Sequence, residues 1–265
     1  MSLYLLKIFI LIRFLSMHKI NLQKYVYELS SIHSFYTYSK DAFENDNLRQ
    51  EIFEKEYKNM FNTALSFVKD GEEAAKLIKQ CEKNIRDQVE SKISKGLEVL
   101  RRQLLEASYS IVEKFLCHVV RVYLYTFPKI LKNTDKKVTF RTIVDLKEND
   151  SIFDHIVEKE IEYFSRFSLQ EKKKYLEKNL KLTKQNELWK YEDMELWKDI
   201  DKKRQAIVHK EETPNISEEY LSSAIFYWNR LMMGIAIYAK IDQGINFEWE
   251  NFSEFIPGKD NPTLR

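Results

Sequence analysis

Arg204 and His209 are the pair of side chains in this sequence whose types and spacing are best suited to chemistry. The guanidinium of an arginine is a permanent cation that binds phosphate oxygens. The imidazole of a histidine, with an unperturbed pKa of about 6.5, takes up and releases protons near neutrality. Together they are able to cleave a phosphodiester such as RNA without a metal ion. The spacing by itself is a weak signal, because Arg13 and His18 repeat it in an apolar leader.

The elements that carry this pair must bring it to one phosphate. On an ideal α-helix, Arg204 and His209 are about 140° apart around the axis and about 7.5 Å apart along it. They converge only if the helix ends or distorts near His209, or if a second copy of the chain contributes its own pair. Gln205 lies one turn before His209 on the same face, where its amide is able to hydrogen-bond the imidazole and select a tautomer.

The composition predicts an all-α fold. The 265 residues include only 5 glycines and 4 prolines, too few for the turns of a many-stranded β fold. With 44% hydrophobic and 14% aromatic residues, the chain is able to bury a sizeable core. Apolar spacing and turn residues predict helices over these ranges: 41–69, 72–127 with Gly96 as the expected break or kink, 150–166, 168–180, 190–209 and 216–241, the last one starting near Ser217. Residues 138–144 fit either an extended segment or a helix start.

The distribution of apolar residues suggests how the chain is divided. The stretch 104–124 is apolar almost all round, as a buried helix is, and marks the centre of a domain over 101–245. Residues 19–100 then form an N-terminal helical extension, and 246–265 a C-terminal tail. Residues 1–18 are an apolar leader whose core, 3–15, is too short to span a membrane. It is expected to be a packed helix or the product of an upstream start codon, with a membrane-surface anchor as the alternative.

Charge and cysteine usage exclude several classes. The net charge of +2 gives no global sign of a nucleic-acid or membrane partner, so any such signal is local. Cys81 and Cys117 lie 36 residues apart without a partner at ligand spacing, which indicates neither a disulfide framework nor a zinc site. We therefore expect reduced thiols, a cytoplasmic protein, no stable membrane insertion, and neither a metal nor another cofactor.

One local basic segment stands out in this nearly neutral chain. Between Arg166 and Lys190 there are eight basic and three acidic residues. Phosphate-binding lysines next to aromatic rings are the two elements of single-strand RNA binding, although a solvated helix face above core aromatics has the same pattern. The candidate RNA-binding lysines are Lys172, Lys173 and Lys174, near Tyr175, Trp189 and Trp197, together with Lys203 and Lys210 beside the Arg/His pair.

The segment from Ile200 to His209 resembles the HEPN superfamily of helical ribonuclease domains. The family signature is an arginine, often followed by a polar residue, and then a histidine after four to six intervening residues. Here this is Arg204-Gln205-Ala206-Ile207-Val208-His209. The resemblance covers about 101–245 and includes the buried run 110–116, the lysine-rich connector and a closing helix that begins near Glu218.

The resemblance implies a HEPN-like helical bundle, with the N-terminal helical extension added, that dimerises to combine two Arg/His pairs. It implies metal-independent RNA cleavage that leaves a 2′,3′-cyclic phosphate, in a toxin or antiphage defence system with an antitoxin or defence-complex partner. His209 would then transfer protons, Arg204 would stabilise the transition state, and Gln205 would support them. Many members have Asn, Asp or His in place of Gln205. Lys210 and Glu211 stand where one toxin subgroup has a tyrosine.

Structural interpretations stay open beside the catalytic one. Arg204 at i+3 from Asp201 fits an ion pair on a solvated helix face, and a histidine is favoured at a helix C-terminus by the helix dipole. Glu113, within the apolar run, fits a polar contributor to a groove, a satisfied core carboxylate or an outward-facing carboxylate. At the level of the whole chain, the alternative function is a non-catalytic helical binding module within a larger defence or RNA-associated complex.

Overall fold

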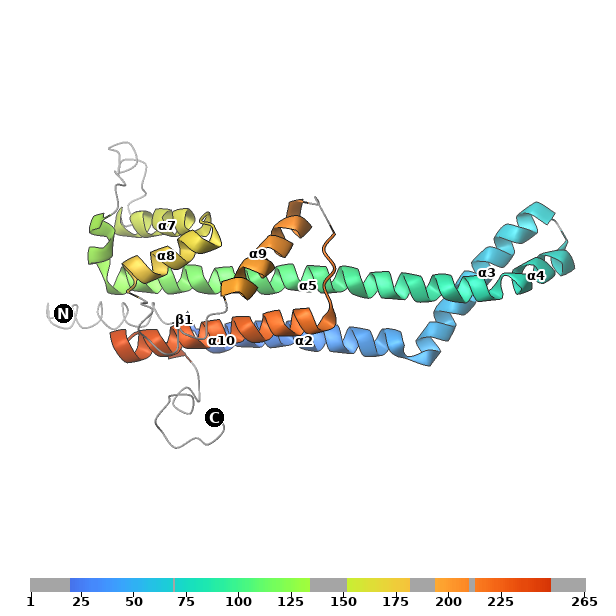
Figure 1. The fold of residues 1–265 in the computed structure, drawn as a ribbon, viewed down its shortest axis with the longest axis horizontal. Helices are drawn as coiled ribbons and strands as arrows, with labels where there is room; N and C mark the ends of the chain where they lie inside the picture. The colour runs from blue at the N-terminus through green and yellow to red at the C-terminus, as the bar shows by residue number, and fades with distance from the viewer. Residues whose placement is uncertain (1–19, 69, 134–151, 182–193, 210–212, 249–265) are drawn as a thin grey trace, which may run out of the picture. The chain divides into compact units, whose positions relative to one another are not determined.

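The computed structural model describes residues 20–68, 70–133, 152–181, 194–209 and 213–248 (Figure 1). These residues are almost entirely helical, which confirms the predicted all-α class. The elements are β1 (Ile20–Asn21), α2 (Leu22–Glu44), α3 (Asp46–Val68), α4 (Gly71–Gln80), α5 (Glu82–Thr126), the 3-10 helix η1 (Pro128–Asn133), α7 (Ile152–Ser165), α8 (Leu169–Asn179), α9 (Met194–His209), α10 (Glu218–Gln243) and β2 (Phe247–Glu248). The apolar leader, residues 138–144, Lys210 and the end of the C-terminal tail lie outside the described residues.

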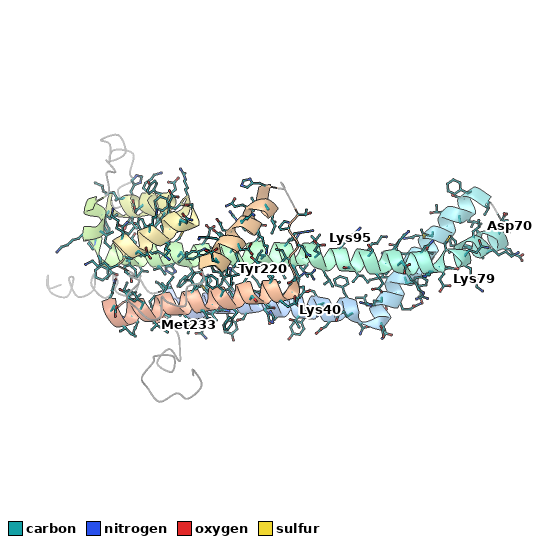
Figure 2. The ribbon with its side chains drawn as sticks, viewed as in Figure 1. Lys40, Asp70, Lys79, Lys95, Tyr220 and Met233 are labelled. Carbon is teal, nitrogen blue, oxygen red and sulfur yellow. The ribbon has the colours of Figure 1, made fainter. Side chains whose placement is uncertain are left out.

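Most helix ends lie within a few residues of the predicted ones, and side-chain caps explain two of the starts. Asp70, between α3 and α4, accepts hydrogen bonds from the backbone N–H groups of Glu72 (2.8 Å) and Glu73 (3.0 Å) at the start of α4 (Figure 2). The hydroxyl of Ser217 accepts a hydrogen bond from the backbone N–H of Tyr220 (3.1 Å), which confirms the predicted start of α10.

The predicted break at Gly96 is wrong. The helical run that follows Asp70 is interrupted at Cys81, between α4 and α5, and α5 then continues through Gly96 for a total of 45 residues. An interior glycine costs only about 1 kcal/mol relative to alanine, which a helix of this length tolerates. Asn45 separates α2 from α3, so the first predicted helix starts later than expected, at Asp46.

The chain divides into two compact units that are each discontinuous in sequence. The first unit takes the described residues within Met1–Leu29, Ser108–Gln205 and Ala224–Arg265, and the second takes those within Ser30–Ala107 and Ala206–Ser223. The division falls inside α2, α5, α9 and α10. The boundary expected between residues 100 and 101 also falls inside α5.

The core of the first unit is formed largely by α5 and α10. In α5, Phe115, Val119 and Tyr123 are completely buried, as the apolar stretch predicted. In α10, Trp228 and Met232 are equally inaccessible. Helices α7, α8 and α9 each contact α5 through side-chain hydrogen bonds, and β1 pairs in parallel with β2 through two residues each.

In the first unit, α7 is tied to α5 by polar contacts near the protein surface. Arg121 donates two hydrogen bonds to the carboxylate of Glu158, at 2.9 and 2.8 Å. The hydroxyl of Tyr125 donates to Asp154 at 2.8 Å. A bidentate arginine–carboxylate pair fixes orientation as well as distance, so the register of α7 on α5 is well defined.

The second unit contains a small core between α3, α4 and the start of α5. Phe53, Ile78 and Ile85 form its buried cluster, and the guanidinium carbon of Arg86 lies 4.0 Å from the centre of the Phe53 ring. Further along α5 in the same unit, Arg101 donates to the carbonyl of Ile216 at 2.5 Å and to the hydroxyl of Tyr36 at 2.9 Å. This arginine therefore connects α5, α2 and the segment before α10.

No helix among the described residues combines the length and apolarity that a membrane crossing requires.

Candidate functional site

Helix α9 carries both members of the Arg/His pair. It has an acidic residue, Glu195, in its first turn and His209 in its last, in agreement with the helix dipole. Trp197 and Ile200 are completely buried, and Arg204, four residues after Ile200, lies on the same face of the helix. The buried stripe thus places the base of the Arg204 side chain against the first unit.

Arg204 lies on an aromatic platform built from two other helices. Its guanidinium carbon is 5.1 Å from the centre of the Tyr109 ring of α5, within the range of a cation–π interaction. The Tyr109 ring meets Trp228 of α10 edge to face at 5.9 Å, and Trp228 meets Trp197 in the same manner at 6.0 Å. These contacts restrict the orientation of Arg204.

Asp201 holds the platform from the same helix as Arg204. The hydroxyl of Tyr109 donates a hydrogen bond to Asp201 Oδ1 at 2.9 Å. Burial, followed by the charge of Asp201, raises the pKa of Tyr109 well above its ordinary value, so the phenol stays protonated and remains the donor. The structural alternative for Arg204 was an ion pair with Asp201, and the structure shows Asp201 as the acceptor for Tyr109.

One polar atom of Arg204 has no partner. Its Nε is buried and makes no hydrogen bond among the described residues. A buried donor left without an acceptor costs about 1–3 kcal/mol, so it requires an explanation such as a bound water, an ion or a catalytic role. An anionic ligand at the guanidinium would supply the missing acceptors.

His209 is the last residue of α9 and its side chain is exposed. Gln205 is exposed as well. The division between the two compact units falls after Gln205, so Arg204 belongs to the first unit and His209 to the second.

The candidate RNA-binding lysines differ in exposure. Lys174 is exposed, whereas Lys173 is half-buried with its amine 3.9 Å from the carboxylate of Glu177. Lys203 is also half-buried and pairs with Asp199 at 2.9 Å. Lys210 lies outside the described residues.

Lys172 does not fit the role expected of it. It is only 2% exposed and its amine forms an ion pair and hydrogen bond with the carboxylate of Glu113 on α5. A lysine in this position is not accessible to an RNA backbone, so Lys172 is removed from the candidate RNA-binding set. Lys172 shares a helix face with Tyr175 and Leu176, both buried, and this spacing was the available signal for an inward direction.

The same ion pair shows that the carboxylate of Glu113 is satisfied, and its side chain is 31% exposed, between the core and the outward-facing interpretations. It also affects a neighbouring thiol, since Cys117 lies one turn further along α5. Burial raises the pKa of Cys117, partly opposed by the positive charge of Lys172. A buried thiol that stays protonated is a poor nucleophile. Cys81 is exposed, and both cysteines are free thiols.

Two further observations concern a second histidine and possible metal ligands. The ring nitrogen Nδ1 of His118 lies 3.2 Å from the hydroxyl of Tyr25, a contact within the first unit that indicates a structural role. Among the described residues, no group of three or more His, Cys, Asp or Glu side chains is arranged to hold a metal ion.

The sequence pattern around Arg204 does not indicate that Tyr109 and Trp228 belong to this site. Tyr109 contacts Asp201 across 92 residues of sequence, and no spacing rule connects positions so far apart.

Comparisons with family models, with curated proteins and with solved structures find no match to this chain.

Proposed function

We propose that this protein is a metal-independent endoribonuclease of the HEPN type that acts in a toxin or antiphage defence system. The observation that carries the proposal is the state of Arg204, whose guanidinium is held on the Tyr109 ring while its Nε lacks a hydrogen-bond partner among the described residues. The exposed imidazole of His209 at the end of the same helix supplies the proton-transfer group.

The proposed chemistry is an internal displacement at phosphorus. The 2′-oxygen of the RNA attacks the adjacent phosphorus and the bond from phosphorus to the 5′-oxygen breaks, which leaves a 2′,3′-cyclic phosphate and a 5′-hydroxyl. His209 accepts the proton of the 2′-hydroxyl or donates a proton to the leaving 5′-oxygen. Arg204 stabilises the charge that develops on the phosphoryl oxygens.

A homodimer supplies the geometry that one copy lacks. Because an ideal helix separates Arg204 and His209 by about 140°, one α9 does not direct both side chains at the same atom. Two copies that bring their α9 helices to a shared groove place the arginine of one beside the histidine of the other. Gln205 supports the histidine, and Lys174, Lys173 and Lys203 contribute positive charge along the RNA.

The direct test is RNA cleavage by the purified protein in EDTA, with His209→Ala beside the parent. His33→Ala is the matched control, because His33 is an exposed helical histidine on α2 that has no role in the proposal. We expect cleavage by the parent and by His33→Ala and loss of at least about a hundredfold with His209→Ala, as for removal of a general acid–base group. A parent that leaves RNA intact, or a His209→Ala variant as active as the parent, contradicts the proposal.

A second candidate function is a non-catalytic binding module in a larger complex. It is favoured by large apolar side chains that the second unit leaves in solvent, among them Phe35 (56% exposed), Tyr38 (73%) and Phe67 (80%). Such residues are common at protein interfaces. Absence of cleavage together with a stable complex that Tyr38→Ala disrupts would favour this candidate.

A further inference from the structure

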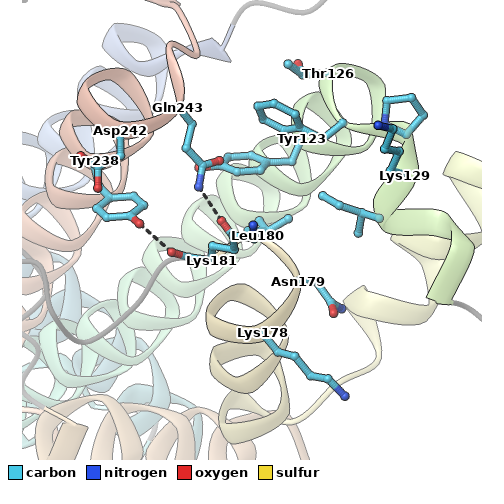
Figure 3. Close-up of a pocket in the computed structure, with 13 residues that line it drawn as sticks. Tyr123, Thr126, Lys129, Lys178, Asn179, Leu180, Lys181, Tyr238, Asp242 and Gln243 are labelled. Carbon is cyan, nitrogen blue, oxygen red and sulfur yellow. Dashed lines mark hydrogen bonds between the residues drawn. The ribbon is translucent and has the colours of Figure 1, made fainter.

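A large cavity lies in the first unit, and Arg204 is not among the residues that line it. It has a volume of about 910 Å³. It is bounded by the end of α5, η1, the end of α8 with the two residues after it, and the end of α10 (Figure 3). Sites for small organic ligands and cofactors have volumes of about 300–1,000 Å³. The cavity is therefore large enough for a ligand of nucleotide size.

Two hydrogen bonds keep one wall of the cavity in place. The hydroxyl of Tyr238 donates to the carbonyl of Lys181 at 2.6 Å, and Gln243 Nε2 donates to the carbonyl of Leu180 at 2.8 Å (Figure 3). Lys181 has a φ of 54°, in the left-handed region that residues other than glycine adopt at a cost. The contacts from α10 hold this conformation, so the wall is formed before any ligand arrives.

Tyr123 contributes a polar atom that nothing satisfies. It is completely buried, lines the cavity, and its hydroxyl has no hydrogen-bond partner among the described residues. Burial raises its pKa, and Tyr238 and Asp242 raise it further, so the hydroxyl stays protonated and is available as a donor. An orphaned buried hydroxyl at the wall of a large cavity points to a ligand that accepts its hydrogen bond.

The charges around the cavity favour an anion. Its lining includes three exposed lysines, Lys129, Lys178 and Lys181, against one carboxylate, that of Asp242. The lysines attract a phosphate, and Asp242 is an acceptor for a ligand amino or hydroxyl group.

Aromatic side chains form the apolar part of the lining. The ring of Phe127 is half-buried and rests against the completely buried ring of Tyr123, with the two ring centres 5.9 Å apart. A flat aromatic ligand packs well against such a ring. The lining thus combines ring surface, a hydrogen-bond donor, a carboxylate and cations.

We propose that this cavity binds a small nucleotide. A nucleotide combines the features that the lining complements: a planar base for the aromatic wall, acceptor atoms for the Tyr123 hydroxyl, ribose hydroxyl or base amino groups for Asp242, and a phosphate for the lysines. The site is separate from Arg204 and His209 and does not depend on the ribonuclease activity.

The test is equilibrium binding to the full-length protein by isothermal titration calorimetry. The probes are AMP, GMP, CMP and UMP, with the nucleoside of each and inorganic phosphate as partial ligands. We expect at least one monophosphate to bind with a dissociation constant below about 1 mM, and its own nucleoside and inorganic phosphate each to bind at least about tenfold more weakly, because each lacks one class of contact. The proposal is overturned if none of the four monophosphates binds, or if inorganic phosphate binds as tightly as the monophosphates.

Two variants assign the binding to this cavity. Tyr123→Phe removes only the unpartnered hydroxyl and is expected to weaken binding of the monophosphate roughly fivefold to tenfold, as for loss of one hydrogen bond. Tyr38→Phe, which removes the hydroxyl of an exposed tyrosine on α2, is the matched control and is expected to leave binding unchanged. Lys178→Glu is expected to weaken the monophosphate more than its nucleoside. If Tyr123→Phe and Lys178→Glu both bind the monophosphate as tightly as the parent, the monophosphate does not bind in this cavity.

Discussion

Replacing Tyr109 by phenylalanine removes one oxygen from the platform under Arg204, and its effect on stability follows from the structure. Tyr109 is 4% exposed and its hydroxyl donates to Asp201 at 2.9 Å. A hydrogen bond to a charged acceptor contributes about 1.5–3 kcal/mol to stability, and Asp201 is only half-buried. We therefore expect Tyr109→Phe to lower the free energy of unfolding by about 2 kcal/mol.

The assay is urea unfolding followed by circular dichroism, with a double-mutant cycle that adds Asp201→Ala. If the hydroxyl acts through Asp201, the two substitutions together cost about 1–2 kcal/mol less than the sum of their separate effects. Tyr38→Phe is the control for loss of an exposed hydroxyl and is expected to change stability by less than about 0.5 kcal/mol. Effects of Tyr109→Phe and Asp201→Ala that add within about 0.5 kcal/mol would refute the reasoning.

The ring of Tyr109 is tested separately from its hydroxyl. Phenylalanine keeps the ring under the guanidinium of Arg204, whereas leucine removes it. A cation–π contact of about 1–2 kcal/mol corresponds to roughly a tenfold effect on a rate that depends on Arg204. In the RNA cleavage assay we expect Tyr109→Leu to be about tenfold slower than Tyr109→Phe, at a temperature where both variants are folded. Equal rates for the two variants would show that the ring does not position Arg204.

Three further predictions concern stability. Glu113→Ala leaves the amine of the buried Lys172 unpaired and is expected to cost about 3 kcal/mol in urea unfolding, most of which Lys172→Met in the same chain recovers; no recovery would contradict the ion-pair account. Asp70→Ala removes two hydrogen bonds from the start of α4 and is expected to cost about 1 kcal/mol by the same measurement, and an unchanged stability would count against the cap. Hydrogen bonds from Ser168 lower the pKa of Glu171 in the folded state, so the contribution of the Glu171 carboxylate to stability is present above the ordinary glutamate pKa and is lost as pH falls through the lowered value. Urea unfolding midpoints measured from about pH 6 to 3 are therefore expected to fall less steeply for Glu171→Gln than for the parent. Parallel curves for the two proteins would exclude the effect.

Local features of the fold were predictable from sequence because local rules decide them. Ser217 before two glutamates is a capping pattern, and it caps α10; Asp70 caps α4 by the same rule, where only the end of the preceding helix was predicted. The apolar stretch of α5 predicted a buried helix because a helix that is apolar on several faces is usually buried. Gly96 failed as a helix break because the small cost of one glycine does not outweigh a long helix on both sides.

The surroundings of the candidate site were only partly predictable. The sequence indicated Arg204, Gln205 and His209 and the end of α9, but the contact between Arg204 and Tyr109 depends on how α9 packs on α5. The prediction of Lys172 as an exposed RNA-binding lysine is wrong. A run of three lysines suggested an exposed helix face, but consecutive residues of a helix face different directions. The cavity around Tyr123 combines three separate segments and has no signature in any one of them.

The central claim is that Arg204 and His209 of two copies act on the same phosphodiester, and subunit complementation tests it most directly. Arg204→Ala and His209→Ala chains are co-expressed with two different tags, and the mixed dimer is purified through both tags and assayed for RNA cleavage in EDTA. Each variant alone is expected to be inactive. The mixed dimer retains one site with the arginine of one copy and the histidine of the other, and is expected to recover about half of the parent rate. A mixed dimer as inactive as the single variants, or cleavage by either variant alone at the parent rate, would contradict the account.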